Sequence, residues 1–131
     1  MDTSGSKILI ADDDRIVRRI VVAKLSGLGY DMTQAEDGQE ALHLLEDGFV
    51  PDLVITDSLM PRMTGLELAR SIRSSPNSDV AKLPIIMLTS RQGEHDVIEG
   101  LQTGLDDYVT KPFSPDELAA RVRTNLWRAR R

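Results

Sequence analysis

Acidic side chains occur in this chain directly after short apolar runs, where a folded sheet could bring them together. Three consecutive aspartates, Asp12, Asp13 and Asp14, follow the first apolar run, and Asp57 follows the third. Carboxylates held close together repel one another, and the repulsion raises their pKa values unless a cation lies between them. Carboxylate and water oxygens suit Mg²⁺, whose coordination a phosphate oxygen can complete. The pattern therefore predicts a divalent-cation site that handles phosphate.

Three further polar residues end later apolar runs, and they extend the predicted site. These residues are Thr89, Ser90 and Lys111. In an open α/β sheet the functional crevice lies at the carboxyl ends of the strands, so all of these side chains are expected on one rim. Asp14 has a structural explanation as the N-cap of the following helix. Two separate sources of carboxylate together with a lysine favour a binding site over capping alone.

The elements that must position these residues can be read from the alternation of apolar runs with segments of helical period. Strands are expected at Ile8–Ala11, Tyr30–Ala35, Leu53–Ile55, Leu83–Leu88 and Asp107–Val109. Helices are expected after Asp14, over a stretch with Ile16 to Leu28 among its apolar positions that ends at Gly27 and Gly29, at Gly38–Glu46, Leu66–Ile72 and Val97–Leu101, and after a capping box at Ser114–Glu117. Asn77–Lys82 is expected to be only a polar loop. Five β-α repeats predict one doubly wound α/β domain with a parallel five-stranded sheet between two helical layers.

Composition and charge narrow the function classes. The 131 residues carry a net charge of −5 and no cysteine, which argues against duplex DNA binding by this domain, a disulfide framework or a thiolate metal site. Five arginines and no acid lie in the last eleven positions, so the acidic charge sits in the body of the chain. No apolar run approaches the length of a membrane span, and we expect a cytoplasmic protein without membrane contact.

Four segments together carry a family resemblance. They are Ile8–Asp14 (ILIADDD), Asp52–Pro61 (DLVITDSLMP), Met87–Ser90 (MLTS) and Asp107–Phe113 (DYVTKPF). In this order and spacing they resemble the signatures of response-regulator receiver domains, in particular those of winged-helix transcription factors. The resemblance implies a flavodoxin-like (βα)5 three-layer sandwich with strand order 2-1-3-4-5. It also implies a receiver domain over 7–127, preceded by a disordered tail at 1–6 and followed at 128–131 by the end of the last helix or a linker.

The resemblance assigns roles to the predicted site residues. Asp57 would be the phosphoacceptor, a carboxylate nucleophile that forms an acyl phosphate. Asp12, Asp13 and Asp57 would hold Mg²⁺, which Mn²⁺ could replace, together with the backbone carbonyl of Leu59. Lys111 would pair with a phosphoryl oxygen, and the Lys111–Pro112 bond is typically cis in the family. Such a domain catalyses its own phosphorylation and dephosphorylation and is not a turnover enzyme.

The resemblance also implies a switch and its partners. Thr89, Ser90 and Tyr108 would respond to the phosphoryl group, which would come from a sensor histidine kinase or a phosphotransfer protein. The response would shift the face formed by the fourth predicted helix, the fifth strand and the fifth helix, and so control a partner or output domain. Seven charged residues on this face resemble those through which such receivers form homodimers: Arg91, Asp96, Asp106, Asp107, Glu117, Arg121 and Arg123.

Residue types alone leave plainer alternatives open. Thr89 is an ordinary β-branched strand residue, Tyr108 a half-buried edge residue, and Arg62, His43 and His95 are interpreted as surface residues. A charged face is usually a solvated surface of little energetic value.

Two other function classes fit the sequence less well. An Mg²⁺-dependent phosphohydrolase with an aspartate nucleophile would need a second acid at Leu59. A flavodoxin-like cofactor binder would need a loop rich in Ser, Thr and Gly after the first strand, where Asp12-Asp13-Asp14 stands.

Two bulky residues predict slow loss of the phosphoryl group. Leu59 lies two positions after Asp57, and Arg91 lies two positions after Thr89. In the family, the side chains at these two positions flank the phosphoryl group. Large side chains there should hinder the attacking water. Smaller polar residues at Leu59 and Arg91 are therefore expected to accelerate dephosphorylation, measured as the decay of phosphorylated protein, and an unchanged decay would contradict this explanation.

Overall fold

The structure is a computed structural model that describes residues 2–90 and 103–130. Its elements are β1 (Lys7–Ala11), α1 (Arg15–Gly27), β2 (Asp31–Ala35), α2 (Gly38–Glu46), β3 (Leu53–Asp57), α3 (Gly65–Arg73), α4 (Ser78–Ala81), β4 (Ile85–Thr89), β5 (Asp107–Thr110) and α6 (Pro115–Ala129). The helix expected at Val97–Leu101 lies outside the described residues, as do Arg91, Asp96 and His95.

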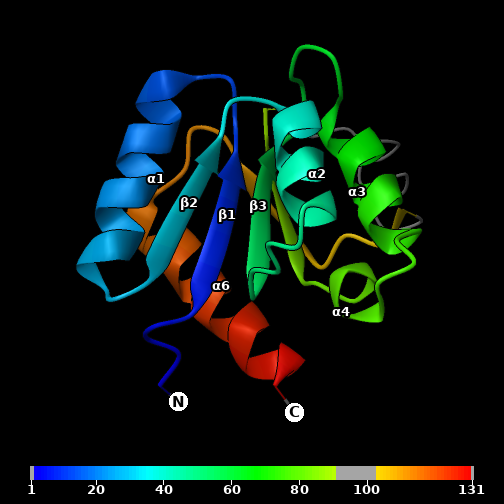
Figure 1. Ribbon diagram of the computed structural model, residues 1–131. Helices are drawn as coiled ribbons and strands as arrows, with labels where there is room; N and C mark the ends of the chain where they lie inside the picture. The colour runs from blue at the N-terminus through cyan, green and yellow to red at the C-terminus, as the bar shows by residue number, and fades with distance from the viewer. Residues whose placement is uncertain (1, 91–102, 131) are drawn as a thin grey trace.

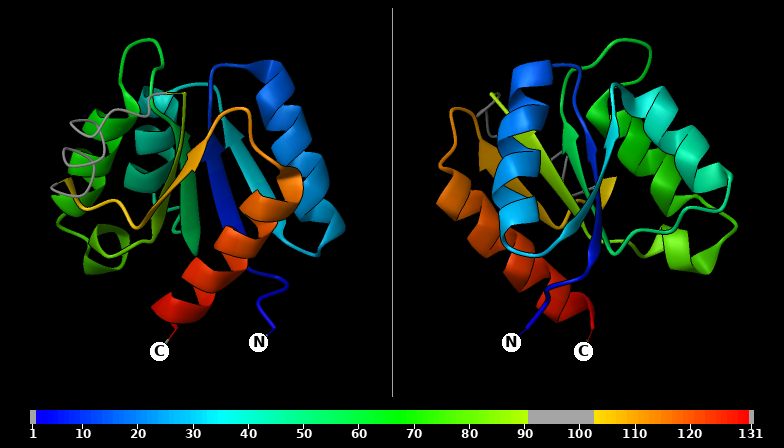
Figure 2. Two further views of the ribbon diagram at one scale, coloured as in Figure 1. Left: turned by 180° about the vertical axis from the view of Figure 1, so that it is seen from behind. Right: turned by 60° about the vertical axis from the view of Figure 1, so that its left-hand side comes forward.

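The five strands form one parallel sheet in the order β2-β1-β3-β4-β5, which confirms the predicted fold class. Helices α1 and α6 cover one face, and α2 and α3 cover the other (Figures 1 and 2). Alternate residues of the central strands feed two cores: Ile8 and Ile10 of β1 pack toward α1 and α6, whereas Leu9 packs toward α2 and α3. Central strands that are buried on both faces explain the continuous apolar runs in the sequence.

Side-chain caps fix where the helices begin. As predicted, Asp14 is the N-cap of α1, and its carboxylate accepts hydrogen bonds from the backbone N–H groups of Ile16 and Val17. Ser114 caps α6 by accepting from the N–H of Glu117, but the Glu117 side chain pairs with Arg121 and the capping box is only half formed. A complete capping box, which the sequence reading missed, opens α3 between Thr64 and Glu67.

Two further expectations differ from the structure. The Asn77–Lys82 segment is not simply a loop, because Asn77 caps the one-turn helix α4. The N-terminal tail has a defined place: Thr3 and Ser6 are buried, and the Thr3 hydroxyl lies 2.6 Å from the hydroxyl of Tyr30. Hydroxyl groups so close to the core need partners, which ties the tail to the sheet.

At the C-terminal end of the described residues, α6 continues to Ala129. None of the described helices is long and apolar enough to cross a membrane.

Arg73 at the end of α3 joins three segments at the opposite end of the sheet from the aspartates. Its guanidinium donates to the backbone carbonyls of Ala81 and Leu83 at 2.9 and 2.7 Å, and to that of Gly104 at 3.0 and 2.7 Å. It also pairs with Asp106 at 2.9 Å. One partly buried side chain thus holds α3, the approach to β4 and the approach to β5 together.

Replacing Arg73 with Met should destabilise the fold while keeping the aliphatic packing. We expect the free energy of unfolding to fall by about 2–4 kcal/mol, because several carbonyls lose a charged donor. Urea denaturation measures this loss, and Arg128→Met at an exposed position of α6 is the matched control. A loss no larger than that of the control would contradict the role given to Arg73.

Candidate functional site

The carboxyl ends of β1 and β3 bring the predicted acidic residues together. Ala11 is paired with Thr56 in the sheet, so Asp12 and Asp57, the next residue in each case, lie side by side. Carboxylate oxygens of Asp12, Asp13 and Asp57 all lie within 4.8 Å of one another. Asp12 is fully buried and Asp57 is 8% exposed, whereas Asp13 faces solvent. The sheet topology therefore assembles the acidic cluster that the sequence predicts.

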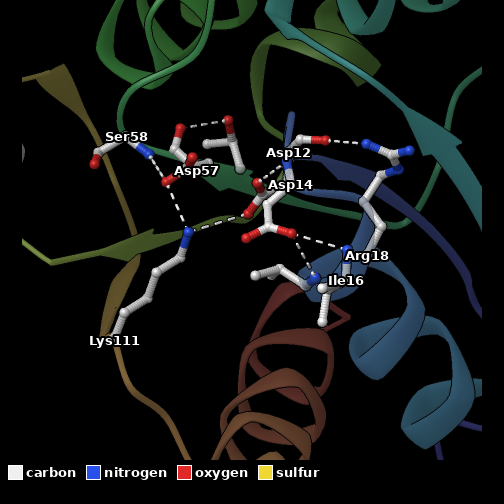
Figure 3. A network of polar contacts seen from close by, with 9 residues as sticks. Asp12, Asp14, Ile16, Arg18, Asp57, Ser58 and Lys111 are labelled. Atoms are coloured by element: carbon white, nitrogen blue, oxygen red, sulfur yellow. Dashed lines mark hydrogen bonds and ion pairs between the residues drawn. The ribbon is translucent and has the colours of Figure 1, made fainter.

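Lys111 reaches this cluster from the end of β5. Its Nζ lies 3.2 Å from Oδ2 of Asp12 and 3.1 Å from Oδ1 of Asp57, as Figure 3 shows. The Lys111–Pro112 peptide bond is cis, as the family resemblance implies. The side chains of Lys111, Asp12 and Asp57 thus form one ion-pair network from three strand ends.

Further hydrogen bonds hold the two carboxylates in place. Asp57 Oδ1 accepts from the backbone N–H of Ser58 at 2.8 Å, and Asp12 Oδ1 accepts from that of Asp14 at 2.8 Å. Arg18 of α1 donates to the carbonyl of Asp12 at 2.6 Å (Figure 3). Both carboxylate oxygens of Asp12 are therefore engaged. In the described part of the chain, Oδ2 of Asp57 has no hydrogen-bond partner, and this oxygen remains available to react.

Burial and charge set the pKa values of the site. Burial raises the pKa of Asp12 above its usual value, and the nearby charge of Asp57 acts in the same direction. Burial alone would lower the pKa of Lys111, but Asp12 and Asp57 outweigh it and raise that pKa. The site thus holds one ammonium group and three carboxylates, so Lys111 balances only part of their negative charge.

The donor set fits a small divalent cation. The three aspartates offer hard oxygen ligands on a partly open rim, which leaves room for water and for a phosphoryl oxygen. Mg²⁺ prefers this combination of few carboxylates and several waters. A dication would also balance the charge that Lys111 leaves uncompensated.

The loop after β3 approaches the site through Gly65, the first residue of α3. The N–H of Gly65 donates to the carbonyl of Ser58 at 2.9 Å, and a Cβ at Gly65 would lie 2.2 Å from the carbonyl oxygen of Asp57. Only glycine allows α3 to start so close to the phosphoacceptor candidate. Within this loop the Leu59 side chain is 57% exposed.

The residues predicted to respond to a phosphoryl group occupy neighbouring strands. Thr89 is buried at the end of β4, one position beyond Leu88, the sheet partner of Asp57. Ser90 follows Thr89 and is exposed. Tyr108 in β5 is half-buried and packs against the α2–α3 side of the core. The structure therefore places Thr89 on the rim with Asp57 and places Tyr108 on the adjacent strand.

Several charged residues of the predicted dimer face have partners within the chain. Arg121 pairs with Asp107 at 2.8 Å and with Glu117 at 3.2 Å, and Asp107 also accepts from Asn125. Asp106 binds Arg73 and accepts from the N–H of Ile85 at 2.7 Å, so it supports the fold at the start of β5. Arg123 is exposed on α6, while Arg91 and Asp96 lie outside the described residues.

Comparison with known proteins decides the family. The model of the response regulator receiver domain matches residues 8–123. The chain belongs to this family. Among solved structures, this receiver domain matches the chemotaxis response regulator CheY4 of Vibrio cholerae with a TM-score of 0.85 and 32% identity, covering 93% of this chain and 99% of that chain. The Francisella response regulator 1452 receiver domain matches with a TM-score of 0.85 and 37% identity, covering 95% and 98%.

Transcriptional regulators are among the similar sequences. The receiver domain is 48% identical over 122 residues to the probable transcriptional regulator ycf27 of Guillardia theta, covering 93% of this chain and 46% of that protein. It is 41% identical over 128 residues to the DNA-binding response regulator MtrA of Mycolicibacterium smegmatis, covering 98% and 54%. The chain thus spans about half the length of these curated relatives, and the match is consistent with the receiver of a winged-helix type of regulator.

The electrostatics of the site predict that removing one of the clustered carboxylates raises the stability of the fold and weakens the binding of Mg²⁺. Asp12→Asn removes a buried charge that burial and the nearby charge of Asp57 make costly to ionise, so in chelator the free energy of unfolding should rise. Millimolar Mg²⁺ should stabilise the unmodified protein but not this variant.

Urea denaturation with and without Mg²⁺ checks both effects. The matched control is Asp116→Asn, which removes an exposed carboxylate outside the site. If Mg²⁺ stabilises Asp12→Asn as much as the unmodified protein, the aspartates are not the metal site.

Proposed function

We propose that this receiver domain is a phosphorylation-dependent switch that accepts a phosphoryl group on Asp57 from a histidine kinase or phosphotransfer protein in the presence of Mg²⁺. The observation that carries the proposal is the network in which Lys111 lies 3.1 Å from Asp57 and 3.2 Å from Asp12. The family membership supports the same function. It also argues against a turnover phosphohydrolase, as does the exposed Leu59 at the position where such an enzyme would need a second acid.

The proposed transfer uses the carboxylate of Asp57 as the nucleophile. Oδ2 attacks phosphorus, the phosphorus–nitrogen bond to the donor's imidazole breaks, and that ring keeps the bonding electrons and takes up a proton. Asp12, Asp13, Asp57 and the Leu59 carbonyl would hold Mg²⁺, which neutralises charge on the phosphoryl oxygens. Lys111 would pair with one of these oxygens as its ion pair with Asp57 is exchanged.

The proposed response begins with the negative charge and the acceptor oxygens that the phosphoryl group brings to Asp57. The hydroxyl of Thr89 would donate to the phosphoryl group, and Tyr108 would move with it on the adjacent strand. This couples Asp57 to β5 and α6, the described parts of the proposed readout face. Partner or output control through this face is part of the proposal.

A homodimer through the same face is also proposed. Arg121, Asp107 and Glu117 would then exchange or share their present partners with a second copy. Light scattering on the phosphorylated and unphosphorylated protein measures this association directly, and a monomer in both states would rule it out.

Acetyl phosphate provides the test of phosphoryl uptake. With Mg²⁺ the intact mass should increase by one phosphoryl group, because phosphoryl transfer from acetyl phosphate to Asp57, with acetate as the leaving group, needs no partner protein. The gain should disappear with chelator and in Asp57→Ala.

Asp116→Asn serves as the control for removal of an acid elsewhere and should take up the group normally. Uptake by Asp57→Ala would show that the site is assigned to the wrong residue.

A further inference from the structure

An ion pair outside the acidic cluster connects α2 to the loop that follows Asp57. Asp37, the N-cap of α2, is only 2% exposed. Its Oδ1 accepts from the N–H of Glu40 at 2.8 Å, and its Oδ2 is paired with the guanidinium of Arg62. The N-terminal end of α2 and the β3–α3 loop lie at the same end of the molecule (Figure 1). A buried carboxylate needs such partners, so the contact is costly to break.

Arg62 occupies its position in spite of an unfavourable backbone conformation. Its φ is 67°, and no other non-glycine residue in the described part of the chain has a positive φ. This left-handed region costs a residue with a side chain about 1–2 kcal/mol. The N–H of Met63 donates to the carbonyl of Pro61 at 2.7 Å, which closes a tight turn around Arg62. The turn aims the guanidinium at Asp37, so the loop conformation and the ion pair depend on each other.

A second contact joins the same two segments. A Cβ at Gly38, the first residue of α2, would lie 3.0 Å from the Cβ, Cγ and carbonyl oxygen of Met63. The start of α2 and the loop therefore approach each other as closely as glycine permits. The approach and the ion pair together fix the loop on its outer side, whereas the Gly65–Ser58 hydrogen bond closes it next to Asp57.

We propose that Asp37 and Arg62 position the β3–α3 loop so that the Leu59 carbonyl can serve as a ligand of the divalent cation. The inference rests on the proposed function and adds two positioning residues outside the metal-binding aspartates. Leu59 lies between Asp57 and Arg62, and its largely exposed side chain offers the loop little anchorage. The position of its carbonyl therefore depends on the contacts on either side. Residues that orient metal ligands in this way typically change metal affinity by about 10- to 100-fold.

The sign of the effect separates positioning from simple electrostatics. Arg62 is a cation near an acidic cluster, and its removal by charge alone would tighten binding of Mg²⁺. Loss of positioning would weaken binding. Burial opposes ionisation of Asp37, but the hydrogen bond from Glu40 and the charge of Arg62 prevail and keep its pKa low, so the pair is charged at neutral pH.

The test measures the Mg²⁺ dissociation constant by calorimetry, together with the free energy of unfolding. Arg62→Asn removes the guanidinium but keeps a side chain that tolerates the left-handed region. We expect its dissociation constant to rise about tenfold. Arg62→Lys should recover much of the affinity. Arg128→Gln, which removes a distant exposed charge, should leave the constant unchanged.

Three further measurements make the result decisive. Asp37→Asn retains a helix cap and should raise the dissociation constant as Arg62→Asn does, and the double variant should be no worse than either single variant. Phosphoryl uptake from acetyl phosphate at saturating Mg²⁺ should stay near the unmodified rate.

An unchanged or lower dissociation constant in Arg62→Asn would overturn the positioning role, even if the stability of this variant falls. Failure of the unmodified protein to bind Mg²⁺ would instead overturn the proposed function itself.

Discussion

The structure of the site depends on the crowding of carboxylates at the ends of β1 and β3. Asp12 and Asp57 are held together by the register of the parallel sheet, and Asp13 completes a group whose oxygens lie within 4.8 Å of one another. Lys111 compensates only part of this charge, and burial of Asp12 adds to the cost of ionising it. A folded state that keeps such a cluster gives up stability in return for affinity toward a dication and a phosphoryl group.

Much of the surrounding fold keeps the carboxylates of Asp12, Asp13 and Asp57 in place without reducing the repulsion between them. The apolar central strands and the two cores fix the strand ends, and Asp14 begins α1 immediately after the acidic residues. Gly65 lets α3 begin against the carbonyl of Asp57. At the far end of the sheet, Arg73 ties α3 to the starts of β4 and β5. The rigid sheet thus places the acids, and the loops around it supply the remaining contacts.

The sequence predicts the features that depend on periodicity and strand order. Buried strands leave continuous apolar runs in the sequence, and parallel topology brings the polar residues at their carboxyl ends to one rim of the sheet. Asp12, Asp13, Asp57 and Lys111 can therefore be predicted as site residues from the sequence. Contacts between distant segments leave no such local pattern. Arg62 reads as an ordinary surface residue, and only the fold shows its partner Asp37. Thr3 in a short polar tail likewise gives no local sign of its contact with Tyr30.

The central claim is that Asp57, and neither neighbouring aspartate, becomes the acyl phosphate. Its Oδ2 is unengaged in the described part of the chain, whereas both carboxylate oxygens of Asp12 have partners. Borohydride reduction of the phosphorylated protein, followed by peptide mass spectrometry, marks the aspartate that carries the phosphoryl group. We expect a single reduced site, at position 57. Reduction at Asp12 or Asp13, with Asp57 intact, would contradict it.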